Sequence, residues 1–317
     1  MGCRILPDVP VLASFARAML FAELSLSAGL AALLHGAGAS LGAALAAVII
    51  CDLAVRAAIT INSFAASSVI ASHGDEAGLS LAARVRLVAT EAWWTAVAFS
   101  VLMPFPRLGG SMDSALPRSG VPVLLVHGYL CNHGIWRAMK RFLESHGIGV
   151  WTHDAEPLFA GIDEYVASLA ARIETILERT RSETLVIVGH SMGGLVLRAY
   201  LRAHGGRRVA LGITLGTPHY GTQLARRGLG RNAREMEPGS PWLEELARAE
   251  AGVLAARVVS IWSRHDNVVA PQESARLEGA ENIAIEGVGH VALVFSSAAQ
   301  SLVLEKILVA AKAKRAG

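Results

Sequence analysis

Val186-Ile187-Val188-Gly189-His190-Ser191-Met192-Gly193-Gly194 is the stretch that decides the fold, because an apolar strand runs here into the pattern G-x-S-x-G. The residues that follow, Leu195 to Arg202, favour a helix. The pattern predicts a sharp strand-to-helix turn that presents the Ser191 hydroxyl, with glycines leaving room for a strained backbone. It also places the Met192 amide at a helix N-terminus, where a negatively charged oxygen would be stabilised. We therefore expect Ser191 to be a nucleophile.

Two later strands end in the groups that a nucleophilic serine requires. The apolar run Val258 to Ser263 leads to Asp266, and the run Asn282 to Glu286 leads through Gly287-Val288-Gly289 to His290. An imidazole can remove the proton of a serine hydroxyl, and a carboxylate can orient that imidazole. We predict Asp266 as the acid and His290 as the base.

Three motifs in this chain resemble those of the bacterial true lipases of the α/β-hydrolase superfamily. They are Gly189-His190-Ser191-Met192-Gly193-Gly194, Leu215-Gly216-Thr217-Pro218-His219-Tyr220-Gly221 and Gly287-Val288-Gly289-His290. The stretch from Trp262 to Leu304 is similar to the small Bacillus-type lipases, and the resemblance covers residues 119–312. The chain order of serine, aspartate and histidine is also that of α/β-hydrolases.

The resemblance implies an α/β fold, the α/β-hydrolase fold, with a mostly parallel sheet flanked by helices. It also implies hydrolysis of carboxylic esters, often lipid esters, through an acyl-enzyme and without an organic cofactor. In α/β-hydrolases the turn that corresponds to His127-Gly128-Tyr129 carries the second amide of the oxyanion hole, so Tyr129 joins Met192 as an expected donor. Two alternatives remain: an acyltransferase or thioesterase with the same triad, and a non-enzymatic membrane interaction protein on a degenerate hydrolase scaffold.

Other ionisable residues compete for these roles. Asp154 and Glu286 are alternative acids, but only Asp266 follows the strand expected beyond the elbow. We expect His127 and His219 to fix loops. Because the histidines are scattered and the three cysteines show no metal-ligand or disulfide spacing, we predict no metal site and no disulfide framework.

Composition points to a bilayer, because 53% hydrophobic and 17% charged residues are too apolar a balance for an ordinary soluble hydrolase. Leu24 to Cys51 carries no charged side chain, which is enough to cross a bilayer once. We predict an all-helical, transmembrane N-terminal region with helices over Val11–Leu34, Ser40–Ile61 and Leu87–Met103. The net charge of +3 is modest and does not suggest nucleic acid as a partner.

Charged residues within these helices favour a second interpretation, a buried cap or dimer interface. They are Arg17, Glu23, Asp52, Arg56 and Glu91. Charges inside a membrane are costly unless they pair or lie near the interface. Asp52 and Arg56 are four residues apart and can pair on one helical face, so they are compatible with a membrane. Oligomeric state is not indicated by the sequence.

The arginines give an orientation. Arg4 precedes the first helix and Arg17 lies near its start, the loop after this helix has no Lys or Arg, and Arg84 and Arg86 follow the second helix, which predicts an inside N-terminus. With three crossings, the catalytic domain lies outside, in the periplasm if the membrane is a bacterial inner membrane. If the first two helices instead form one interfacial hairpin, the predicted topology flips.

The chain divides into three parts. We expect the membrane region over residues 1–105, a Pro- and Gly-rich linker over residues 106–120 and the catalytic domain over residues 121–317. An insertion over residues 222–251 carries four arginines followed by Pro238-Gly239-Ser240-Pro241-Trp242. It is either a lid over the site or a solvated helix pair.

Overall fold

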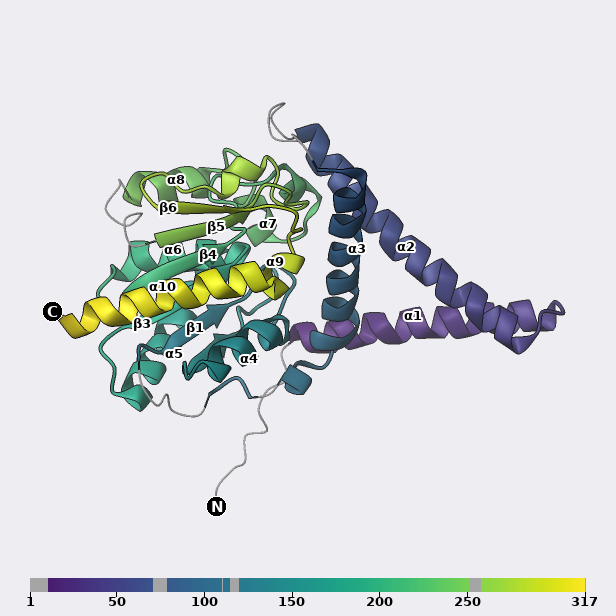
Figure 1. Cartoon of the computed structure of the whole chain (residues 1–317), viewed down its shortest axis with the longest axis horizontal. Helices are drawn as coiled ribbons and strands as arrows, with labels where there is room; N and C mark the ends of the chain where they lie inside the picture. Colours follow the sequence, from purple (N-terminus) through teal and green to yellow (C-terminus); the bar gives the residue numbers. More distant parts are fainter. Residues whose placement is uncertain (1–10, 71–78, 110, 115–119, 251–257, 317) are drawn as a thin grey trace, which may run out of the picture.

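A six-stranded parallel sheet forms the centre of the C-terminal half of the molecule (Figure 1). The computed structural model describes residues 11–70, 79–109, 111–114, 120–250 and 258–316. In spatial order the strands are β2 (Val150–His153), β1 (Val123–Val126), β3 (Leu185–His190), β4 (Val209–Leu215), β5 (Val258–Ser263) and β6 (Glu281–Ile285). The predicted α/β architecture with a parallel sheet is confirmed.

Helices cover both faces of the sheet because the central strands, such as β1 and β3, are buried on both sides. In β1, Leu124 and Val126 belong to one core and Val123 and Leu125 to the other, as the alternation of side chains along a strand requires. The first core contains α5 (Glu164–Thr180), α6 (Met192–His204) and α8 (Pro241–Glu250). The second contains α4 (Arg137–Ser145), α9 (Ala292–Phe295) and α10 (Ser297–Ala316). Fully parallel sheets are buried in this way.

Three long helices precede the sheet and extend away from it. They are α1 (Val11–Gly36), α2 (Leu41–Ile70) and α3 (Leu81–Val97), and α3 continues into a π-helical turn, η1 (Ala98–Leu102). In Figure 1 they form the sides of a triangle: α1 leaves the sheet domain, α2 returns to it, and α3 runs along it. All three are long and apolar enough to cross a membrane.

Two helix boundaries differ from the sequence prediction. Helix α2 continues past Ile61 to Ile70, because the hydroxyls of Ser63, Ser67 and Ser68 donate to carbonyls three residues earlier and are satisfied within the helix. Helix α3 begins at Leu81 rather than Leu87, because Ser80 caps it by accepting a hydrogen bond from the Ala83 amide at 3.3 Å.

The predicted linker is partly attached to the sheet. After the 3₁₀ turn η2 (Pro106–Gly109), Asp113 forms an antiparallel bridge with Trp151 of β2 and ion pairs with Arg172 and Arg179 of α5. Residues 115–119 lie outside the described residues.

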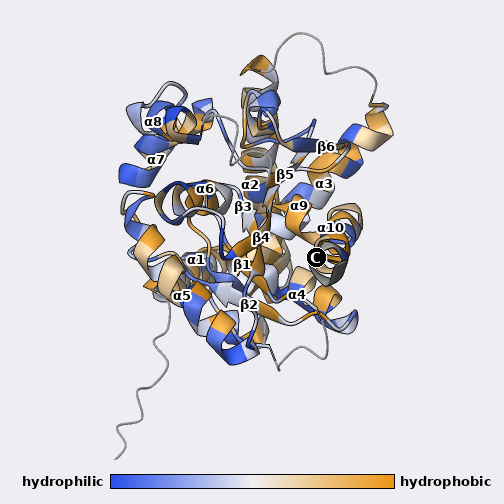
Figure 2. Cartoon of the chain, turned by 90° about the vertical axis from the view of Figure 1, so that its left-hand side faces the viewer, coloured by the Kyte–Doolittle hydropathy of each residue, from blue (hydrophilic) through white to orange (hydrophobic). Residues whose placement is uncertain are grey.

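The insertion expected over residues 222–251 contains η4 (Gln223–Arg227), α7 (Arg231–Glu235) and α8, and residue 251 lies outside the described residues. Helix α8 buries Leu243 and Leu246, and Glu250 at its end forms a buried ion pair with Arg198 of α6. Figure 2 shows hydrophilic residues on α7 and α8 and hydrophobic residues concentrated around the sheet. The insertion is therefore a packed layer with a polar outer surface.

Candidate active site

Ser191 occupies a strained turn between β3 and α6. Its φ of 54° and ψ of −125° are unusual for a residue with a side chain, which identifies the turn as strained. A Cβ on Gly193 would lie 2.2 Å from the Val126 carbonyl oxygen, and one on Gly189 would lie 2.6 Å from the Gly193 backbone. The two glycines are thus required by close backbone contact. The predicted strand-turn-helix geometry is present.

Asp266 and His290 are hydrogen-bonded to each other, with 2.8 Å between Asp266 Oδ2 and His290 Nδ1. The other carboxylate oxygen, Oδ1, accepts from the amides of Val268 and Val269 at 2.8 Å each. Both side chains are buried. Because Asp266 binds Nδ1, the Nε2 lone pair of a neutral His290 is available to another group.

The electrostatics of His290 favour its protonated form. Burial lowers the pKa of His290, but the charge and hydrogen bond of Asp266, together with the charge of Glu91, raise this pKa above its ordinary value of 6.5. The neighbouring His190 is buried without such a partner, and burial holds the pKa of His190 well below that value. His290 is therefore the basic imidazole of the pair.

The serine turn and the His290 loop meet at the carboxyl edge of the sheet. The rings of His190 and His290 are 4.7 Å apart between centroids, and His190 Nε2 lies 3.2 Å from the His290 carbonyl oxygen. Gly216, just after β4, fills the space beside the pair: a Cβ there would lie 3.1 Å from Asp266 Oδ2. Ser191, Asp266 and His290 thus follow the ends of β3, β5 and β6 at one edge of the sheet.

The two expected oxyanion donors flank Ser191. Met192 is the first residue of α6, so its amide is among those that the helix leaves without an internal partner. Tyr129 follows Gly128, whose Cβ, if present, would lie 2.8 Å from the Ser191 Cβ. The Tyr129 hydroxyl instead donates to the Leu229 carbonyl at 2.7 Å and accepts from the Leu229 amide at 2.9 Å. Its side chain therefore joins this turn to the insertion.

The competing residues have other partners. Asp154 accepts from the amide of His133 and lies 2.6 Å from its Nδ1, and Glu286 is paired with Arg264 at 3.5 Å. His127 accepts from the Ala155 amide at 3.0 Å, and Thr214 lies 3.1 Å from His219 Nε2. Both histidines thus fix loops, as expected. Within the described residues there is no cluster of three metal-ligating side chains.

Sequence reasoning missed the residues that hold the His290 loop. The Asn267 Oδ1 accepts from the His290 amide at 3.0 Å, and Asn267 Nδ2 donates to Ser63 of α2 at 2.8 Å. Glu91 of α3 accepts from the Val291 and Ala292 amides. In the sequence, Glu91 stood out only as a costly charge in an apolar helix. Such a charge is itself a signal that the side chain has a buried partner.

Residues 121–233 match the family model described as the alpha/beta hydrolase fold. This part of the chain therefore has the α/β-hydrolase fold. A triacylglycerol lipase from Pseudarthrobacter phenanthrenivorans is 31% identical to this chain over 112 residues, 33% of this chain and 35% of that protein. One from Burkholderia plantarii is 31% identical over 112 residues, covering 33% and 31%. The chain therefore spans about a third of the length of these curated relatives.

A solved structure gives the same fold. The mature form of the Bacillus licheniformis lipase BlEst2 is 18% identical, with a TM-score of 0.55, and the match covers 61% of this chain and 94% of that one. Its propeptide form matches with a TM-score of 0.54 and 18% identity, over 61% of this chain and 52% of that one. The α/β-hydrolase fold and its similarity to lipases agree with the resemblance noted from the motifs.

Proposed function

We propose that this protein is a serine carboxylic-ester hydrolase, a lipase or esterase, that acts on acyl esters at a membrane. One observation carries the proposal: a serine on a strained elbow lies at the same sheet edge as a buried, hydrogen-bonded His290–Asp266 pair. The similarity to triacylglycerol lipases over 112 residues supports an acyl ester as the substrate class.

In the proposed reaction His290 Nε2 removes the Ser191 proton as the serine oxygen attacks the acyl carbonyl. Asp266 holds the imidazole by Nδ1 and stabilises the imidazolium that forms. The alcohol leaves with a proton from His290, and water, activated by the same imidazole, then releases the acid from the acyl-enzyme.

The amides of Met192 and Tyr129 are the proposed oxyanion donors. A helix N-terminus and a tight turn against Ser191 are suitable positions for them, because donors fixed before the reaction need no rearrangement. Loss of one such donor costs about 3 kcal/mol of barrier. These are backbone groups, so side-chain substitutions leave the donors themselves in place.

The test is labelling with a fluorophosphonate and hydrolysis of nitrophenyl esters of increasing chain length, with full-length protein in detergent. We expect both to occur in the parent and to be lost in Ser191→Ala. Turnover that peaks at long chains supports a lipase, and turnover confined to short chains supports an esterase. Folded parent protein that is neither labelled nor active contradicts the proposal.

If the protein is labelled but does not hydrolyse esters, the result supports the same triad with an acyl acceptor other than water. An alcohol or thiol that enters in place of water makes the site an acyltransferase. Adding such acceptors to labelled, inactive protein and detecting the acylated product distinguishes this function from hydrolysis.

We also propose that α1 and α2 attach the protein to a bilayer. Large apolar side chains are exposed along both helices, including Phe21, Leu26, Leu33, Ile50 and Leu53. Arg56 of α2 pairs with Glu23 of α1 and with Asp52, so each of these two carboxylates has a cationic partner within the hairpin. Retention in the membrane after carbonate extraction is the expected result, and release into the soluble fraction contradicts it.

The contacts favour insertion of α1 and α2 as a hairpin rather than three crossings. At one end of the hairpin the Val11 amide donates to Glu156 at 2.6 Å, and Ser63 binds Asn267. The turn between the helices lies far from the α/β-hydrolase domain (Figure 1). The middle of α3 binds the His290 loop through Glu91, which would place that loop at the bilayer centre if α3 crossed. We therefore infer that the domain lies on the same side as the N-terminus.

A further inference from the structure

Glu91 lies in the middle of α3, yet its carboxylate is bound by the α/β-hydrolase domain. Only 1% of Glu91 is exposed, and its Oε1 and Oε2 accept from the amides of Val291 at 3.0 Å and Ala292 at 2.9 Å. These are the two amides that directly follow His290. A carboxylate is costly to bury unless hydrogen bonds compensate, so an apolar residue would suffice if α3 only covered the domain.

The neighbouring side chains fix the same loop. A Cβ on Gly289 would lie 2.5 Å from Glu91 Oε2, so the absence of a side chain at 289 admits the carboxylate. Trp94, three residues after Glu91, stacks on Phe295 with ring centroids 4.2 Å apart and planes 1° from parallel. Helix α3 thus contacts the loop on both sides of His290.

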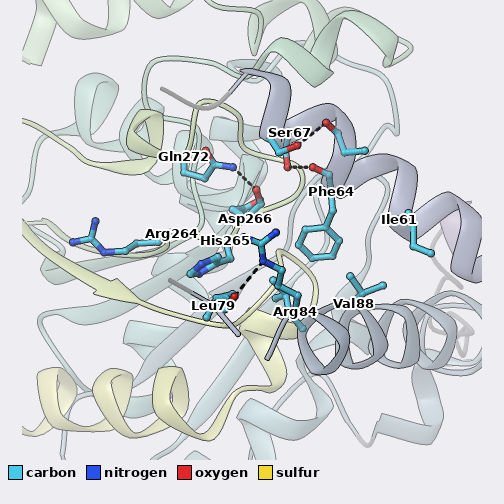
Figure 3. Close-up of a pocket in the computed structure, with 13 residues that line it drawn as sticks. Ile61, Phe64, Ser67, Leu79, Arg84, Val88, Arg264, His265, Asp266 and Gln272 are labelled. Carbon is cyan, nitrogen blue, oxygen red and sulfur yellow. Dashed lines mark hydrogen bonds between the residues drawn. The ribbon is translucent and has the colours of Figure 1, made fainter. Parts of the chain in front are cut away.

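Helix α2 is connected to the His290 amide through Asn267. Asn267 accepts from this amide at 3.0 Å and donates to Ser63 at 2.8 Å. The acid loop is also part of a wall of an apolar cavity of about 300 Å³ between α2, α3 and residues 264–266 (Figure 3). Three successive backbone amides are therefore bound. Glu91 of α3 accepts from those of Val291 and Ala292, and Asn267, which contacts α2, accepts from that of His290.

We propose that Glu91 is a positioning residue for His290, so that activation of Ser191 requires α3 to be docked on the α/β-hydrolase domain. The proposal rests on the proposed hydrolase function. It adds that the N-terminal helices complete the active site as well as attach the protein to a membrane.

The pH dependence of activity can distinguish this positioning role from a purely structural one, because it depends on the charges around His290. The groups that face the imidazole are Asp266 from the loop after β5, His190 from the end of β3 and Glu91 from α3. His190 is kept neutral by burial, whereas the charge of Glu91 contributes to the raised pKa of His290. Removing that charge lowers the pH at which His290 loses its proton.

The experiment compares full-length parent, Glu91→Gln and Asp52→Asn in detergent, by fluorophosphonate labelling rate, ester hydrolysis over pH and thermal unfolding. Asp52→Asn removes a carboxylate from the same helical region away from His290 and is the matched control. We expect Glu91→Gln to reduce labelling rate and kcat/KM by about ten- to a hundredfold, since its amide group opposes one of the two backbone N–H groups. We also expect the acidic limb of the pH–activity profile of Glu91→Gln to move to lower pH.

Glu91→Gln with parental rates and an unchanged acidic limb overturns the proposal. So does an equal loss in Asp52→Asn, which would indicate a general effect on the helices. A parent that is neither labelled nor active contradicts the hydrolase function instead, so the two failures are distinguishable.

A second pair of variants keeps the test valid if Glu91→Gln folds poorly. Gly289→Ala places a methyl group against Glu91 Oε2, and we expect it to reduce kcat by about tenfold or more. In Glu91→Ala the opposing atoms are gone, so adding Gly289→Ala should cost little further. Equal losses in both backgrounds show that Gly289 acts independently of Glu91 and overturn the proposal.

Discussion

The His290 imidazole lies among Asp266, Glu91 and His190, and in the proposed mechanism its protonation determines when Ser191 can be activated. Burial opposes the charged form, but the carboxylates raise its pKa above 6.5. The proposed general base must be neutral, so activity is lost as pH falls through this raised pKa. We expect the acidic limb of kcat/KM for a nitrophenyl ester to have its midpoint above pH 6.5. A midpoint below that value in the parent contradicts the assignment of His290 as base.

Folding stability should depend on His290 in the opposite direction. The folded-state pKa is above the unfolded value of 6.5, so protonation stabilises the folded state. This contribution is fully present below pH 6.5 and is lost as pH rises through the folded pKa. The pH dependence of thermal unfolding should differ between the parent and His290→Gln by this contribution, since the other buried histidines titrate in both proteins. Identical pH dependence in both proteins contradicts the raised pKa.

At this scale the sequence was informative about Ser191, Asp266 and His290, because each follows an apolar strand in a recognisable local pattern. Glu91 and Ser63 could not be assigned a role in the same way. Their partners lie about 200 residues later, and no local pattern records such a contact. Asp266 and His290 are hydrogen-bonded as the sequence suggested, whereas the catalytic roles stay predictions until variants are tested.

At the scale of elements, the insertion is joined to the domain by the buried Arg198–Glu250 pair. Two hydrogen bonds of about 3 Å join Arg198 Nε to the Glu250 carboxylate. Glu250→Ala leaves the guanidinium buried without a counter-ion, which should cost about 3–5 kcal/mol. A large fall in Tm is the expected measurement. Arg198→Met with Glu250→Leu should recover part of this loss, and no recovery would contradict the ion-pair explanation.

The π-helical end of α3 is pressed against the turn η3 (His133–Trp136). A Cβ on Gly134 would lie 2.2 Å from the Leu102 carbonyl oxygen. Gly134→Ala should therefore destabilise the protein by about 1–3 kcal/mol, seen as a lower Tm. Gly42→Ala in α2 has open space within 4 Å and is the control, expected to leave Tm unchanged or slightly higher. Equal Tm values for the two variants would contradict this packing.

The strands that lead to Ser191, Asp266 and His290 were predicted closely because each is a short, mainly apolar run that ends at a turn. Prediction was poorer at the facing ends of α2 and α3, where serines are ambiguous: a hydroxyl can bond its own helix, as Ser63 does, or cap one, as Ser80 does. The same residue type thus extended one helix and began the next. Residues 71–78, between these ends, lie outside the described residues.

At the scale of the whole molecule, the hairpin arrangement predicts which side of the membrane carries the active site. With the native cysteines replaced, a single cysteine at the exposed Glu183 reports the position of the domain. Arg4 and Arg17 favour an inside N-terminus, so we expect this cysteine to resist an impermeant maleimide in spheroplasts and to react after lysis. Reaction in intact spheroplasts would instead support three crossings and an outside domain.

The hydrogen bond between Glu91 and the Val291 amide joins residues that are 200 positions apart, so it cannot form until the later part of the chain has been synthesised. Helices α1 to α3 leave the ribosome first, and the hairpin of α1 and α2 can enter the bilayer before the sheet exists. Contacts of such long sequence separation form late, because a large loop must close first. A nascent chain in which the Ser191 turn has already formed therefore still lacks the docked His290 loop. Under the proposed function, the serine does not attack acyl esters in the membrane until the last strand, β6, has been synthesised and the His290 loop after it has docked on α3.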